Sequence, residues 1–214
     1  IDDSEQNREW EKNPPKLEQK IYLSFTISDG DNLQYVENRM LDCWKQKDAE
    51  DQVPVGWSIS PLTLEYAPHM VDYYYQSATP HDYFISGPSG AGYIYPNRIG
   101  SDDFEIYLNT SRYYLDKMDL TEIWTLGISN PATYSTMVKK TGIQAIFDGY
   151  SQKTLGSVKT TSNEVPIFRM FKHGTTSDEL KQWIDQFLPL NSLNRPMFIP
   201  IWVHCWSQDY NYIE

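Results

Sequence analysis

The sequence predicts an α/β protein whose core is a parallel (β/α) barrel of about seven strands. Seven short apolar segments rich in β-branched and aromatic residues are typical of buried strands, and segments with helical spacing separate most of them. Strands that alternate with helices form parallel βαβ units with right-handed crossovers. Polar, glycine-rich and aromatic residues follow most of the strands, which favours a barrel over an open sheet that would gather them at one switch point.

The predicted elements follow one another regularly along the chain. We expect strands at residues 21–27, 53–59, 82–86, 122–128, 143–147, 165–171 and 197–203. We expect helices that begin near Leu33, at Pro68, and after N-caps at Ser101, Asn130 and Ser177, and the fourth of these should end near Gly142. Because only 11 residues follow the last predicted strand, we expect a closing helix and strand to be missing from the barrel.

The first 20 residues differ in character from the rest of the chain. They are polar and contain a Pro14–Pro15 pair, so we expect a linker or N-terminal extension at 1–20 and the barrel domain at 21–214. The two cysteines, Cys43 and Cys205, fit either two buried thiols or one disulfide. Two cysteines alone form neither a zinc site nor a disulfide framework.

Charge and hydropathy exclude several classes of partner. With 18 Lys and Arg against 29 Asp and Glu, the net charge of −11 argues against nucleic acid and against an anionic membrane surface. No apolar run approaches the ~20 residues that span a bilayer. Aromatic residues make up 14% of the chain, and an acidic, aromatic-rich composition suits sugar binding.

The first predicted strand ends in a turn that carries two carboxylates, at residues 28–32 (SDGDN). Either Asp31 or Asn32 is expected to cap the helix that follows. Asp29 follows the apolar strand directly and is not expected to cap the helix, so it is a candidate functional residue. The paired carboxylates are suited to sharing a metal or to holding a hydroxylated ligand.

A glycine-rich stretch follows the third predicted strand, at residues 87–96 (GPSGAGYIYP). It lacks both the Walker spacing and the GxGxxG dinucleotide spacing. The stretch fits a tight loop with Tyr93 and Tyr95 packed inward, and it fits equally well a platform around Gly92 on which tyrosine rings stack against a sugar.

Residues 90–96 (GAGYIYP) match the pattern G-x-G-Y-x-Y-P at every position. In this segment the chain resembles the GxGYxYP family, which is assigned to the glycoside hydrolases and found largely in bacteria. The turn at 28–32, the strand end at 57–61 and the segment 147–150 also resemble that family. The resemblance implies a barrel related to glycoside hydrolases and polysaccharide deacetylases, an N-terminal domain absent from this chain, and a secreted or periplasmic location.

Further candidates follow other predicted strands. The catalytic carboxyl groups are expected among Asp29, Asp31, Asp148 and Glu65, because glycoside hydrolysis usually uses two such groups. Asp148 also fits an Asp-Gly turn, and Glu65 also fits a solvated loop. Sugar-binding contacts are expected from Tyr93, Tyr95, Gly92, Asn32, Tyr150, His204, Trp206 and Arg169.

Three functions remain open from the sequence. The first is a glycoside hydrolase that acts on a poly- or oligosaccharide at the carboxyl face of the barrel. The second is a metal-dependent polysaccharide deacetylase, which would need a further pair of histidines; His69, His81 and His173 lack the H-x-x-x-H spacing. The third is a glycan-binding domain without catalysis. We therefore expect a carbohydrate ligand and no metal or other cofactor.

Overall fold

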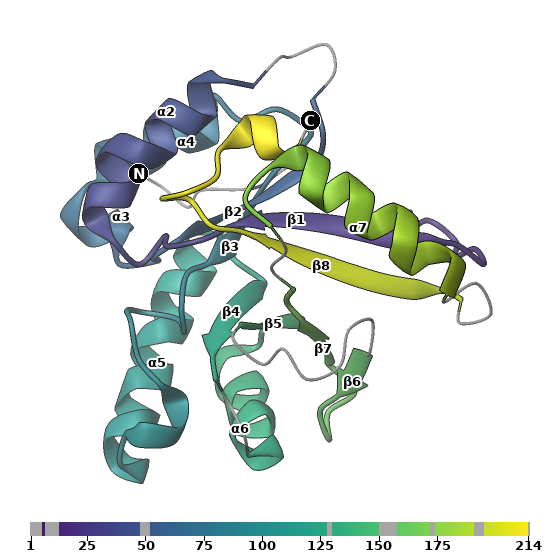
Figure 1. The fold of residues 1–214 in the computed structure, drawn as a ribbon. Helices are drawn as coiled ribbons and strands as arrows, with labels where there is room; N and C mark the ends of the chain where they lie inside the picture. The colour runs from purple at the N-terminus through teal and green to yellow at the C-terminus, as the bar shows by residue number, and fades with distance from the viewer. Residues whose placement is uncertain are drawn as a thin grey trace.

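The computed structural model describes residues 6, 13–47, 52–127, 130–149, 158–171, 174–190 and 195–213. Within this part of the chain, an eight-stranded sheet curls into a nearly closed barrel in the order β6-β7-β5-β4-β3-β2-β1-β8 (Figure 1). The strands are β1 (Ile21–Ile27), β2 (Val55–Ile59), β3 (Asp82–Ser86), β4 (Glu122–Leu126), β5 (Ala145–Gly149), β6 (Val158–Thr160), β7 (Pro166–Arg169) and β8 (Met197–Val203). All neighbours run parallel except β6, which runs antiparallel to β7.

The ring closes between β8 and the chain that follows β7. β8 pairs with β1 over seven residues. On its other side, the Phe171 N–H donates to the Pro200 carbonyl (2.8 Å), and the Trp202 N–H donates to the Phe171 carbonyl (2.6 Å). β8 thus pairs directly with β1, where we expected a missing closing strand, and the prediction of a parallel barrel of about seven strands is confirmed.

Helices cover the outside of this barrel. They are η1 (Tyr35–Arg39, a π-helical turn) with α2 (Met40–Lys45), α3 (Thr63–Tyr66), α4 (Pro68–Gln76), α5 (Ser101–Lys117), α6 (Pro131–Thr141) and α7 (Ser177–Leu190). Figure 1 shows α7 lying along β1 and β8, with α5 and α6 near β3, β4 and β5. Among the described helices, none is long and apolar enough to cross a membrane.

Successive side chains along each strand point to opposite faces of the sheet, so they contribute alternately to two cores. The larger core lies between the barrel and its helices. The smaller core lies in the barrel interior, where Ile85, Trp124, Met170 and Trp202 are buried beside Phe147. The rings of Trp124 and Trp202 meet edge to face at 5.3 Å. The register of β4 therefore decides which of its residues face the interior.

The strand predictions are confirmed to the residue for β1, β3 and β8. β5 was predicted to end at Phe147, and this boundary is wrong: β5 extends to Gly149, because the polar Asp148 is a buried member of the strand. β6 was not predicted, since its three residues are exposed and carry no apolar pattern.

The predicted helix ends are partly correct. The Asn130 side chain accepts a hydrogen bond from the Ala132 N–H (3.0 Å), and Gly142 ends the same helix with a φ of 77°, as expected. Ser101 does not cap α5, because Gly100 is the N-cap and Ser101 is the first helical residue.

The predicted cap at Ser177 is also displaced by one residue. The Thr176 hydroxyl accepts from the Glu179 N–H (3.3 Å), and the Glu179 carboxylate accepts from the Thr176 N–H (3.2 Å). This reciprocal pair is a capping box, which makes Thr176 the cap and leaves Ser177 in the first turn of α7.

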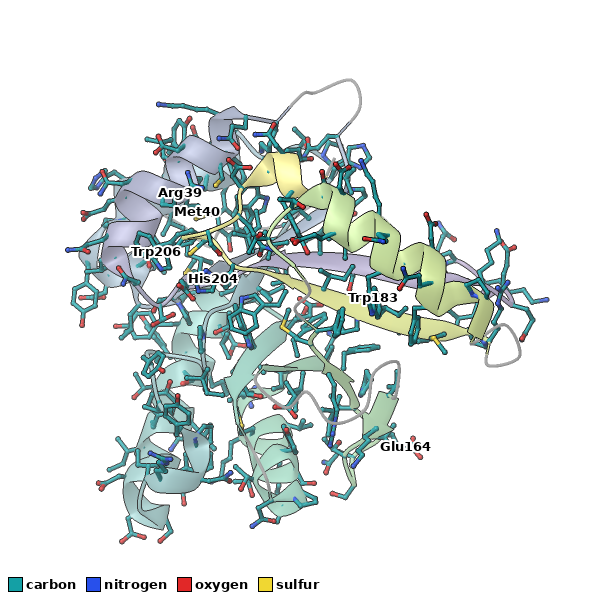
Figure 2. All side chains as sticks on the ribbon, viewed as in Figure 1. Arg39, Met40, Glu164, Trp183, His204 and Trp206 are labelled. Atoms are coloured by element: carbon teal, nitrogen blue, oxygen red, sulfur yellow. The ribbon has the colours of Figure 1, made fainter. Side chains whose placement is uncertain are left out.

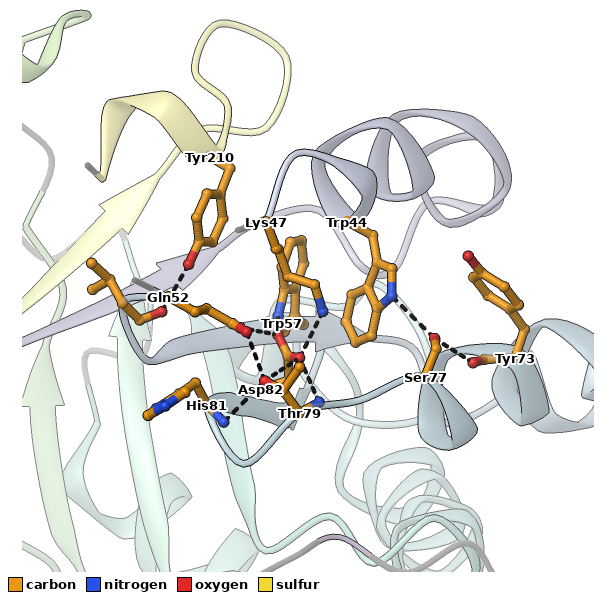
Figure 3. Close-up of polar contacts among 11 residues, drawn as sticks. Trp44, Lys47, Gln52, Trp57, Tyr73, Ser77, Thr79, His81, Asp82 and Tyr210 are labelled. Carbon is orange, nitrogen blue, oxygen red and sulfur yellow. Dashed lines mark hydrogen bonds and ion pairs between the residues drawn. The ribbon is translucent and has the colours of Figure 1, made fainter. Parts of the chain in front are cut away.

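A buried polar cluster joins the starts of β2 and β3 (Figure 3). The Asp82 carboxylate accepts hydrogen bonds from Lys47 Nζ (2.6 Å), Gln52 Nε2 (2.8 Å) and Trp57 Nε1 (2.8 Å). It also accepts from the Thr79 N–H (2.8 Å). The carboxylate thus ties α2, β2 and the turn before β3 together at the amino end of the barrel.

Lys47 completes this cluster as a buried cation. The side chains of Lys47 and Asp82 are 7% and 0% exposed. The ammonium lies 3.2 Å from the centroid of the Trp44 ring, which adds a cation–π contact. Burial lowers the pKa of Lys47, and the hydrogen bond and charge of Asp82 oppose that shift.

Asp82→Ala should lower the free energy of unfolding by about 3–5 kcal/mol, because it leaves a buried ammonium and the Trp57 N–H without their acceptor. Urea denaturation measures this. As a control, Asp116→Ala breaks the exposed Arg112–Asp116 pair and should change stability by less than about 1 kcal/mol. An Asp82→Ala effect as small as that of the control would contradict the prediction.

Candidate functional site

A cavity of about 250 Å³ opens at the carboxyl ends of β1, β3 and β4. Among the described residues, its lining comes from the turn after β1, the loop after β3 and β4 itself: Asp29, Asp31, Asn32, Pro88, Tyr93, Trp124 and Leu126. Active sites of (β/α) barrels lie at this end, because the loops that follow the strands gather there.

The turn after β1 is held tightly against β2. The Gly30 N–H donates to Ser58 Oγ (2.9 Å), and the Gly30 carbonyl accepts from the Ser60 N–H (2.7 Å). A Cβ at Gly30 would overlap the backbone carbonyl of Ser58. Only glycine therefore permits the approach that places the carboxylates on either side of it at the barrel mouth.

Asn32 is the residue that caps the following helix. Its Oδ1 accepts from the Tyr35 N–H (3.3 Å), and its own N–H donates to the Asp29 carbonyl (3.0 Å). Of the two predicted caps, Asn32 has this role and Asp31 does not. Asn32 also lines the cavity, where we predicted a sugar contact.

Asp29 has an unusual backbone and a specific side-chain partner. Its φ of 67° lies in the left-handed region, which costs a non-glycine residue roughly 1–2 kcal/mol. Its Oδ2 accepts a hydrogen bond from the Cys205 thiol at 3.3 Å. Strained backbone of this kind persists where the surroundings hold it in place, and it clusters at functional sites.

Asp31 has a strongly perturbed carboxyl group. Burial raises its pKa to about 6, with a further contribution from the negative charge of Asp29, while a hydrogen bond from its own backbone N–H opposes the shift. Asp31 therefore binds a proton at mildly acidic pH. Titratable groups with such shifts are candidates for acid–base chemistry.

The glycine-rich loop after β3 is anchored to α5. The Tyr107 hydroxyl donates to the Gly92 carbonyl (2.5 Å), and Ser111 Oγ accepts from the Ala91 N–H (3.0 Å). Gly92 has a φ of 138°, a backbone conformation that residues other than glycine rarely adopt. These contacts fix the loop so that Tyr93 stands at the cavity.

Tyr93 and Tyr95 lie at the rim rather than packed inward. Tyr93 is 55% exposed, and its hydroxyl lies 3.2 Å from that of Tyr95. The Arg98 guanidinium lies 5.0 Å from the centroid of the Tyr95 ring. The exposed ring of Tyr93 beside the carboxylates fits the sugar platform of the two interpretations that the sequence left open.

Trp124 is a cavity residue that the sequence did not indicate. It is 1% exposed and lines the pocket with Leu126, two positions along β4. Its indole N–H has no hydrogen-bond partner among the described residues. Because Trp124 lies within an apolar strand, only the alternation of β4 places it on the interior face.

The structure does not bring Asp148 or Arg169 to this cavity. Asp148 is 1% exposed and pairs in register with Thr125 and Arg169 in the neighbouring strands. Burial and the Asp148 carboxylate raise the pKa of Tyr134 on α6, and Arg169 opposes the shift. Asp148 and Arg169 thus belong to a cluster between the sheet and α6.

The remaining candidates lie outside the described lining of the cavity. Glu65 is exposed on α3 and accepts from the Tyr114 hydroxyl at 3.2 Å. The ring of His204 lies 3.1 Å from the Ser207 hydroxyl, and Trp206 is 49% exposed. Both follow β8 on the side of η1 (Figure 2). Tyr150 falls outside the described residues.

Both cysteines are buried and have free thiols. Of the two interpretations of Cys43 and Cys205, the structure therefore has the pair of thiols. Within the described part of the chain, no three His, Cys, Asp or Glu side chains gather as a metal site would require.

The family model described as "GxGYxYP putative glycoside hydrolase C-terminal domain" matches residues 19–214. The chain belongs to this family. The cavity lies at its signature segment, since Tyr93 is the first tyrosine of the motif. A search of curated proteins gives no match.

Two solved structures are similar. One is a "putative hydrolase" from Bacteroides thetaiotaomicron, with a TM-score of 0.80 and 28% identity over 94% of this chain and 42% of that one. The other is a protein of glycosyl hydrolase family 38 from Enterococcus faecalis, with a TM-score of 0.51 and 12% identity over 89% of this chain and 24% of that one. The second shares the fold alone. This chain spans less than half the length of either relative.

The shifted carboxyl group predicts a pH-dependent stability. The pKa of Asp31 in the folded state, about 6, lies above the roughly 3.9 of an unfolded chain, so the folded state binds this proton more tightly. The stability that this proton supplies is complete below the unfolded value and is lost as the pH rises through about 6.

The stability of Asp31→Asn relative to the unsubstituted protein should therefore rise as the pH is raised from about 5 to about 7.5, because Asn cannot lose a proton. Urea denaturation of both proteins at the two pH values measures the difference. An advantage that shrinks with rising pH would contradict the assigned environment of Asp31.

Proposed function

We propose that the protein hydrolyses a glycosidic bond in this cavity and that Asp29 and Asp31 are the two catalytic carboxyl groups. The observation that carries the proposal is their convergence: one turn presents both carboxyl groups to a cavity with Trp124 in its lining and Tyr93 at its rim. Carboxyl pairs are the usual catalytic groups of glycosidases. The family description and the relative's description as a hydrolase agree with this class of reaction.

The two carboxyl groups have different environments, which suggests different roles. Asp31 keeps its proton up to a pH of about 6 and is the donor to the leaving-group oxygen. Asp29 accepts a hydrogen bond from a neutral thiol and acts as a carboxylate, either as base towards water or as nucleophile. The two carboxyl groups are thus assigned to different steps of the proposed reaction.

The lining suits a sugar ring. Aromatic faces stack on the apolar faces of sugars, and the exposed ring of Tyr93 supplies such a face from the loop after β3. Trp124, on the neighbouring strand β4, forms a buried wall of the cavity. At about 250 Å³ the cavity is smaller than the roughly 300–1,000 Å³ of sites for drug-sized ligands, so it suits one sugar unit.

The carbohydrate substrate, a secreted or periplasmic location and a further N-terminal domain belong to the same proposal. The family's description as a glycoside hydrolase supports a carbohydrate substrate, and its description of this region as a C-terminal domain supports a further N-terminal domain. The location is carried over from the family resemblance alone.

Asp29→Asn and Asp31→Asn should each lower the rate of glycoside hydrolysis by about 10²–10⁴-fold, as expected when one acid–base group is removed. Release of p-nitrophenol from a panel of aryl glycosides, together with release of reducing ends from oligosaccharides, measures the rate. The measurement should use the longest form of the protein that can be expressed.

Asp116→Asn is the matched control, because Asp116 is an exposed aspartate on α5. It should retain the unsubstituted rate. Loss of activity in this control, or full activity in both pocket variants, would contradict the proposed roles of the two carboxyl groups.

The value of kcat/KM should fall as the pH rises above about 6, because the donor role of Asp31 requires its proton. Initial rates from about pH 4 to about pH 9 give this profile. A plateau that extends well beyond neutral pH would rule out Asp31 as the proton donor.

A further inference from the structure

Cys205 lies directly behind the candidate carboxylate Asp29. Its thiol is fully buried and donates to Asp29 Oδ2 at 3.3 Å, across 176 positions of sequence. Cys205 follows β8, and Asp29 follows β1, so the pairing of these two strands brings the residues together. Cys205 has no assigned role in the proposed reaction, so its contact with Asp29 calls for an explanation of its own.

The backbone of Cys205 is held at both ends. Its N–H donates to Ser28 Oγ (3.4 Å), and its carbonyl accepts from Arg39 Nε (2.8 Å). Arg39 also donates through Nη2 to the Gln208 carbonyl (3.3 Å). Figure 2 shows Arg39 close to the chain that carries His204 and Trp206. With the backbone held in this way, the thiol of Cys205 points to Asp29.

The environment keeps the thiol protonated. Burial raises the pKa of Cys205, and the charge of Asp29 and the hydrogen bond to it raise the pKa further. The titratable and charged groups around this pair are Asp31, Tyr35, Cys43 and Arg39. An S–H group that does not ionise is a donor at every pH at which the protein is folded.

We propose that Cys205 is a positioning residue that orients the Asp29 carboxylate towards the cavity by donating its thiol hydrogen to Oδ2. This inference rests on the proposed function, in which Asp29 acts as the unprotonated carboxylate. The hydrogen bond engages Oδ2, and in this proposal Oδ1 is the oxygen that acts on the sugar or water. A carboxylate that is free to rotate loses this orientation, and small misplacements of reacting groups reduce rates strongly.

Cys205→Ala removes the donor and Cys205→Ser keeps one. Cys205→Ala should lower kcat by about 10- to 100-fold with KM changed less than about twofold, since orientation of the carboxylate affects the chemical step. Cys205→Ser should restore most of the rate.

Cys43→Ala is the matched control, because Cys43 is a second fully buried thiol on α2. A merely structural role for buried thiols predicts the same kinetic change in Cys43→Ala and Cys205→Ala. Our proposal predicts that Cys43→Ala leaves kcat unchanged. Equal effects in the two variants, or a Cys205→Ser variant as impaired as Cys205→Ala, would overturn it.

Crystal structures of the variants separate this inference from the proposed function. In Cys205→Ala the Asp29 carboxylate should adopt a new orientation or several, while the backbone of 28–32 stays in place. In Cys205→Ser it should match the unsubstituted protein. A rotated carboxylate in a protein without hydrolase activity would uphold the positioning role and refute the proposed function. An unmoved carboxylate in Cys205→Ala would overturn the positioning role whatever the activity.

Discussion

The close approach of Gly30 to β2 is the constraint on which the site depends. The turn after β1 lies so near the Ser58 backbone that a Cβ at Gly30 would overlap it, and hydrogen bonds to Ser58 and Ser60 hold it there. The next strand joins the same contact, since the Gly87 N–H donates to the Ile59 carbonyl (2.8 Å). The ends of β1, β2 and β3 thus form one rigid edge that aims the carboxylates on either side of Gly30 into the cavity.

Rigid placement lets two chemically identical side chains behave differently. Asp31 is desolvated beside a negative charge, whereas Asp29 receives a hydrogen bond from a neutral donor. Different environments for two carboxyl groups are how a single fold supplies an acid and a base together. The strained φ of Asp29 fits the same picture, because a relaxed backbone would aim its side chain elsewhere.

The sequence predicted those parts of the molecule whose signals are local. The turn at 28–32, the glycine-rich loop and all strands of the barrel except the exposed β6 each have a pattern of neighbouring residues, and each was found. Asp148 was interpreted as the end of a strand because it is polar, yet a buried strand accepts a polar residue whose partners lie on adjacent elements. Trp124 and Cys205 gave no signal, since the register of β4 and the pairing of β1 with β8 decide where they point.

The most direct test is a crystal structure of the Asp29→Asn variant soaked with an oligosaccharide that the unsubstituted protein cleaves. We predict one sugar unit inside the cavity, with its ring against Tyr93 or Trp124 and the glycosidic oxygen within hydrogen-bond distance of the Asp31 carboxyl group. Sugar bound instead in the apolar groove of α2 and α4, around Met70 and Tyr73, with the cavity beside Asp31 empty, would contradict the assignment of this pocket as the active site.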